Sequence, residues 1–134
     1  MSDSILDRLT GRGDIPTRTA DDQELEDLQS FGWLRGVRDR AVMLELRHLN
    51  GNITCYGYAW LEKAVLDPSE GITLHFGGKT VRVIGRQLNG MVRPNISLFA
   101  GIVRHKVPWI RESGFGDAAN GPSNATIIDE IQVT

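Results

Sequence analysis

The residues of this sequence that could carry out acid–base, nucleophilic or metal chemistry are few and far apart. Its three histidines, His48, His75 and His105, fall in different predicted elements, and none has a second ligand at metal-binding spacing. Cys55 is the only cysteine, so no intramolecular disulfide can form, and we expect an inert thiol in the core. Because no Ser-His-Asp order, paired-carboxylate signature or H-E-x-x-H motif occurs, the sequence favours a non-catalytic protein without metal or cofactor. A small enzyme is a third alternative, for which no motif gives positive support.

Two short segments match ligand-binding motifs only in part. Residues 77–80, Gly-Gly-Lys-Thr, resemble the end of a phosphate-binding loop. Thr73, however, occupies the position of that motif's first glycine, and the segment is predicted to join two strands rather than a strand and a helix. Asp67, Glu70 and Glu62 could bind a hard cation near one turn, but ordinary turn chemistry explains the first two better.

An aromatic residue occurs at every second position from Tyr56 through Tyr58 to Trp60. Alternate residues of a strand point to the same face, so these rings are expected side by side. The hairpin register predicted from the Asn50-Gly51 turn places them opposite the aliphatic core. They form either a stacking platform for bases or a peptide, or a surface covered by a helix, and the covered surface is favoured.

Basic residues are concentrated in the middle of the chain. Residues 1–30 contain 8 acidic and 3 basic residues, residues 31–111 contain 5 acidic and 12 basic, and residues 112–134 contain 4 acidic and none basic. The net charge of −2 therefore conceals a middle of +7 between ends of −5 and −4. Such a middle attracts a polyanion, the chain's own acidic ends, or those of a neighbouring subunit.

These cations support a nucleic-acid hypothesis, because Lys and Arg bind phosphates. The hypothesis requires them to share one surface, and no RNA-binding signature accompanies it. RNA binding is therefore the alternative to a non-catalytic module that binds a protein partner or another copy of itself. The candidate binding residues are Tyr56, Tyr58, Trp60, Arg47, Arg82, Arg86, Arg104 and Lys106, and the wider basic set adds Arg93, Arg35, Arg38 and Arg40.

The clearest element signal is a hairpin over residues 41–59. Leu44 and Leu46 alternate with polar residues, which is the period of a half-buried strand, and Asn50-Gly51 predicts a two-residue turn. That turn pairs Leu46 with Cys55 and places both on the apolar face.

Three further strands are predicted after this hairpin. Residues 61–66 form one strand, residues 67–71 supply turn chemistry, and residues 72–76 and 79–84 form a second hairpin around Gly77-Gly78. The predicted apolar pairs of this hairpin are Leu74 with Val81 and Ile72 with Val83.

Two helices are predicted to flank the strands. The first runs from Thr19 to about Ser30, with acidic residues in its first turns where the helix dipole favours them. The second begins at Asn95 or Ser97 and ends before Pro108, which cannot continue a helix.

The sequence divides into an acidic leader with one short helix (1–30), a basic core (31–112), a flexible linker (113–125) and a short apolar tail (126–134). The apolar tail must be buried somewhere. It adds a strand to its own sheet, adds one to another subunit's edge, or docks as a short helix.

These elements predict an α+β domain, with an antiparallel meander or small partly closed barrel of about five strands and flanking helices. A helix followed by five short strands over residues 20–88 resembles Sm-like and SH3-like small barrels in order and length, but no specific motif of either group is present. The chain begins without a secretory signal and has no membrane-length apolar run, so we expect a cytoplasmic protein without membrane contact.

Overall fold

The computed structural model describes residues 25–113 and 125–134, which form three β-sheets, one α-helix and one 3₁₀ helix. The α-helix α2 is Leu98–Val103 and the 3₁₀ helix η1 is Tyr58–Trp60. The strands are β2 (Leu25–Asp27), β3 (Gly32–Leu34), β4 (Met43–Arg47), β5 (Ile53–Gly57), β6 (Leu61–Asp67), β7 (Gly71–Phe76), β8 (Lys79–Arg86), β9 (Trp109–Arg111) and β10 (Ile127–Val133).

The predicted α+β fold with flanking helices and a partly closed barrel is wrong. The described residues are mostly β, and none of their sheets closes into a barrel. In place of the end of the first predicted helix, β2 pairs antiparallel with β3. Gln29 has φ +75° between these strands, and its backbone N–H donates to Asp27 Oδ1 at 2.8 Å. This side-chain-stabilised turn reverses the chain, which a continuing helix could not do. The earlier part of that helix lies outside the described residues.

Four antiparallel strands form the larger sheet, in the order β10-β8-β7-β6. Its central pair has the predicted register, with Leu74 opposite Val81 and Ile72 opposite Val83. The C-terminal segment, for which three arrangements were open, is strand β10 and pairs with β8 of its own sheet. Most of the predicted linker lies outside the described residues.

A second sheet has the order β5-β4-β9, with β4 antiparallel to β5 and parallel to β9. The predicted two-residue turn between β4 and β5 is wrong, because Leu46 pairs with Thr54 and not with Cys55. The connection is one residue longer: His48 N–H donates to the Asn52 carbonyl, and Gly51 takes φ +96° inside the loop. A three-residue loop that ends on a glycine with positive φ is a common hairpin connection.

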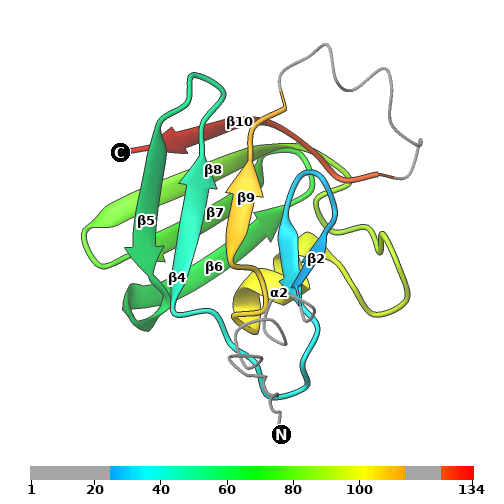
Figure 1. The fold of residues 1–134 in the computed structure, drawn as a ribbon. Helices are drawn as coiled ribbons and strands as arrows, with labels where there is room; N and C mark the ends of the chain where they lie inside the picture. Colours follow the sequence, from blue (N-terminus) through cyan, green and yellow to red (C-terminus); the bar gives the residue numbers. More distant parts are fainter. Residues whose placement is uncertain (1–24, 114–124) are drawn as a thin grey trace, which may run out of the picture.

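The two larger sheets pack face to face, and β5, β4 and β9 lie in front of the four-stranded sheet in Figure 1. One end of the core is covered by α2, which buries Leu98 and Ile102. Within the described residues, no helix is long and apolar enough to cross a membrane. Side chains from both sheets and from α2 fill the core, among them Phe31, Leu44, Leu46, Ile72, Leu74, Val81, Val83, Leu98, Ile102, Ile110 and Ile128.

Candidate binding surface

The structure does not bring the three residues of the aromatic row onto one face. Tyr56 lies opposite Leu44 and points into the core, where its ring stacks on Phe76 with the centroids 5.3 Å apart. The row also leaves the strand, because β5 ends at Gly57 and the next three residues form η1. The predicted continuous platform therefore does not form.

Tyr58 is a structural residue. Its side chain is 2% exposed, its ring stacks on His105, and its hydroxyl donates to the Val107 carbonyl at 2.6 Å. Burial raises the pKa of the Tyr58 hydroxyl well above its ordinary value. Tyr58 is therefore covered by the segment that follows α2, and not by a helix as expected for the aromatic row.

Trp60 differs from both tyrosines because 68% of its surface is exposed. A Cβ placed on Gly57 would lie 3.3 Å from the indole, and one on Gly77 would lie 4.0 Å from it. The Trp60 carbonyl accepts a hydrogen bond from Gly77 N–H at 3.0 Å, which fixes the backbone beneath the ring. An exposed aromatic ring is thereby held beside the end of β5.

β5 is an edge strand whose outer backbone groups have no partner among the described residues. His48 and Asn52 form a hydrogen-bonded pair, and Tyr58 N–H donates to the Val42 carbonyl. Hydrogen-bonded and non-bonded pairs alternate along antiparallel strands, so Thr54 and Tyr56 bond to β4. The backbone groups of the residues between them point away from β4, toward the open edge. Those residues are Ile53, Cys55 and Gly57.

The edges of the four-stranded sheet are protected, and this contrast marks out β5. On β10, Glu112 Oε2 accepts from Ile131 N–H at 2.7 Å, and Ser113 N–H donates to the Ile128 carbonyl at 2.8 Å. On β6, the register shifts between Leu61 and Lys63, and charged residues occupy that position. Bulges, charges and covering segments are the usual means by which proteins block edge-to-edge pairing. β5 contains no charged residue and no proline.

Arg47 lies on the outer face of the β5-β4-β9 sheet, because its neighbours Leu44 and Leu46 point inward and are fully buried. Its guanidinium pairs with Glu45 at 2.5 Å and lies over the Trp109 ring, 4.3 Å from the centroid. Arg47 is therefore engaged within its own sheet.

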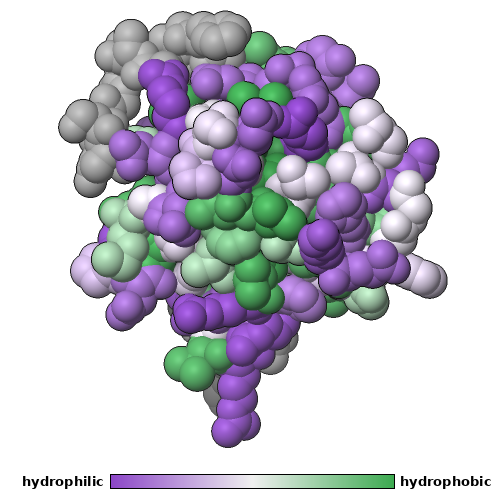
Figure 2. Space-filling view, turned by 180° about the vertical axis from the view of Figure 1, so that it is seen from behind, coloured by the Kyte–Doolittle hydropathy of each residue, from purple (hydrophilic) through white to green (hydrophobic). Residues whose placement is uncertain are grey.

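Arg82 and Arg86 point outward from the other sheet, since Val81 and Val83 beside them are buried. Arg82 pairs with Glu70 at 2.9 Å, and Arg86 pairs with Asp129 at 3.5 Å. Seen from the side of this sheet, hydrophilic residues surround a hydrophobic strip near the centre of the face (Figure 2).

The two remaining candidate cations differ in burial. Lys106 is 8% exposed, and its ammonium donates to the carbonyls of Gly36 and Asp39, so it holds a loop in place. Arg104 is exposed, directly after α2. The five candidate cations thus lie on the outer faces of two opposed sheets, beneath a loop and at a helix end, and not on one surface.

Acidic residues from the flanks neutralise part of the basic middle. Glu26 on β2 pairs with Arg93, and Asp129 on β10 pairs with Arg86. Each of these carboxylates has a buried oxygen that accepts no hydrogen bond within the described residues, so the nearby arginine supplies only an opposite charge. These pairs support the interpretation that acidic residues of the chain's own ends neutralise basic residues of its middle.

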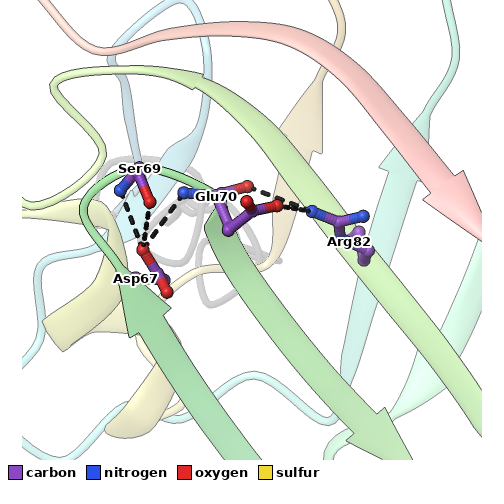
Figure 3. Close-up of polar contacts among 4 residues, drawn as sticks. All are labelled: Asp67, Ser69, Glu70 and Arg82. Carbon is purple, nitrogen blue, oxygen red and sulfur yellow. Dashed lines mark hydrogen bonds and ion pairs between the residues drawn. The ribbon is translucent and has the colours of Figure 1, made fainter.

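The turn between β6 and β7 explains the acidic residues considered as cation ligands (Figure 3). Asp67 Oδ1 accepts hydrogen bonds from the Ser69 backbone at 2.9 Å, the Ser69 hydroxyl at 2.8 Å and the Glu70 backbone at 3.2 Å. The backbone and side-chain bonds from Ser69 lower the pKa of the Asp67 carboxyl. Glu70 pairs with Arg82 instead of turning toward Asp67. Among residues 25–113 and 125–134, no three His, Cys, Asp or Glu side chains gather to hold a metal ion.

An open cavity of about 460 Å³ lies between this turn and residues 84–90. Its polar rim includes Asp67, Gln87 and Asn89, and its apolar wall includes Leu66 and Leu88. No described histidine or cysteine lines it. Of its two carboxylates, Asp67 is used within the turn and Glu70 pairs with Arg82. The cavity assembles no acid–base or nucleophilic pair.

Cys55 is exposed, so its predicted place in the core is wrong. The longer loop shifts the hairpin by one residue and pairs Cys55 with Glu45, whose side chain points outward. The histidines remain apart: His105 stacks on Tyr58, His75 pairs with Thr80, and His48 lies 3.9 Å from Glu112.

No protein-family model matches this chain, and neither a curated protein nor a solved structure matches it. The candidate surface is therefore identified from the exposure and hydrogen bonding of its residues alone. The open edge was not predicted from the sequence, because the prediction considered which side chains of this strand face the core and not which backbone groups lack a partner. The uncharged run from Ile53 to Gly57, compared with the charged Glu62 and Lys63 of β6, was the available signal.

Proposed function

We propose that this protein is a non-catalytic interaction module that binds an extended polypeptide segment along β5. The observation that carries the proposal is the open backbone edge at Ile53, Cys55 and Gly57, with the exposed Trp60 ring at its end. A strand added there gains main-chain hydrogen bonds, and the adjacent apolar side chains supply selectivity.

Apolar contact area accompanies the edge. Ile53 is 59% exposed, Met43 is 45% exposed on the neighbouring strand, and Trp60 is 68% exposed. Tryptophan is enriched among the residues that contribute most to protein–protein binding. The RNA-binding alternative has less support, because the cations it needs are divided between two sheets and most of them have partners within the chain.

Selection from a displayed library of seven-residue peptides tests the proposal. We expect wild-type protein to enrich extended peptides with apolar residues at alternate positions. Ile53→Lys, which places a charge at the edge, and Trp60→Ala should each weaken binding of those peptides by at least about tenfold.

Val37→Lys is the matched control, because Val37 is 88% exposed and lies in the loop between β3 and β4. It should leave peptide binding unchanged. Enrichment of peptides that bind wild type and Ile53→Lys equally would refute the proposed surface.

A further inference from the structure

We infer that the segment that occupies the β5 edge is β5 of a second copy of this chain, in a two-fold dimer centred on Cys55. This inference rests on the proposed function and names its partner. A two-fold dimer uses the same patch on both subunits, so that patch must be complementary to itself. The β5 edge meets this requirement in its backbone, its charge and its side-chain sizes.

The backbone of β5 is complementary to itself when two copies run antiparallel. The outward-facing residues Ile53, Cys55 and Gly57 are spaced evenly about Cys55. With Cys55 opposite Cys55 of the second copy, Ile53 of each copy lies opposite Gly57 of the other. All three positions then form hydrogen-bonded pairs, which gives about six inter-chain hydrogen bonds.

The charge of the strand permits this pairing. Like charges directly opposite one another destabilise antiparallel strands, and a charge at the central position would lie opposite its own copy. No residue from Ile53 to Gly57 is charged. On the neighbouring strand, Glu45 and Arg47 neutralise each other at 2.5 Å.

The side chains fit by size. Ile53 of one copy faces Gly57 of the other, where no side chain opposes it. The exposed Trp60 ring already lies against that glycine, 3.3 Å from the position of a Cβ. Each Ile53 would therefore pack on the Trp60 ring of the second copy, which covers two exposed apolar side chains at the edge. Glycine inside a strand commonly marks such a close approach.

Sedimentation velocity over a range of concentrations tests the dimer with the full chain. Wild type and Cys55→Ser should both change from monomer to dimer as concentration rises. Ile53→Lys and Trp60→Ala should weaken dimerisation at least about a hundredfold, because symmetry applies each substitution twice. Val37→Lys should dimerise like wild type. A dimer that persists in Ile53→Lys would place the interface elsewhere and overturn the inference.

Cross-linking through Cys55 tests the register of the dimer. Opposed residues of a hydrogen-bonded pair have Cα atoms about 5.5 Å apart, so a short bismaleimide should join two wild-type chains in high yield. Cross-linking yield should fall to background in Ile53→Lys, which keeps its thiol.

A chain that stays monomeric at every concentration overturns the dimer. If edge-dependent peptides are still selected in that case, the proposed module stands with a different partner. If neither the dimer nor edge-dependent peptides appear, both proposals fail.

Discussion

Replacing Tyr58 with Phe tests whether the middle of the aromatic row is structural. The change removes the hydroxyl that donates to the Val107 carbonyl at 2.6 Å and keeps the ring that stacks on His105. Val107 is fully buried, so its carbonyl would lose a partner in a place that water does not reach. An unsatisfied buried acceptor costs about 1–3 kcal/mol. For a domain of this size, that corresponds to a fall of roughly 3–15 °C in the unfolding midpoint.

Thermal and urea unfolding followed by circular dichroism would measure this difference. Tyr56→Phe is the matched control, because no hydrogen bond of the Tyr56 hydroxyl occurs within the described residues. It should change the free energy of unfolding by less than about 0.5 kcal/mol. If Tyr58→Phe were as stable as Tyr56→Phe, the stabilising hydrogen bond from the Tyr58 hydroxyl to the Val107 carbonyl would be refuted.

Alkaline pH provides a second readout of the same contact. Burial raises the folded-state pKa of Tyr58 above its unfolded value. The corresponding stability is therefore fully present below about pH 10 and is lost as the pH rises further. Tyr58→Phe should remove this part of the alkaline loss, and a titration of stability against pH for both proteins would show it.

Three further predictions concern the turns and the exposed ring. Gly71→Ala should lower the free energy of unfolding in urea by more than about 2 kcal/mol, because Gly71 has φ +103° and its new Cβ would lie 2.3 Å from the Val83 carbonyl oxygen. Gly78→Ala is the control and should be nearly neutral, because the space around Gly78 is open. Hydrogen bonds to Asp67 lower the pKa of its carboxyl, so the ionised carboxylate stabilises the fold above about pH 4 and this stabilisation is lost as the pH falls. Asp67→Asn should reduce the loss of stability measured between neutral and acidic pH. Trp60→Ala should change stability by less than about 0.5 kcal/mol yet remove most acrylamide-quenchable fluorescence, because Trp33 and Trp109 are only 8% and 5% exposed; strong residual quenching would contradict this.

The second hairpin was predictable because the alternation of its apolar residues and the position of its turn indicate the same register. Residues 72–76 and 79–84 alternate strictly, and the two-glycine turn allows one register that keeps Leu74 and Val81 on the same face. The predicted register of the first hairpin was wrong because Asn50-Gly51 also fits a loop that is one residue longer. One extra residue reversed the predicted faces of Cys55 and Tyr56, since side chains alternate along a strand.

The fold class could not be derived because β2 and β10 become strands only by pairing with other segments. The Leu25 segment resembles the end of an acidic helix, and only its pairing with β3 makes it a strand. Residues 127–133 fit a strand or a helical face equally well until β8 is placed beside them. Tertiary contacts override local preference in such short segments.

Amide hydrogen exchange along β5, measured by NMR, tests the central claim most directly. In dilute protein we expect slow exchange at Thr54 and Tyr56, which bond to β4, and fast exchange at Cys55 and Gly57, which face the open edge. At concentrations where the chain dimerises, the Cys55 and Gly57 amides should become protected. Strong protection of both amides in the dilute monomer would show that the edge is already covered and would contradict the account.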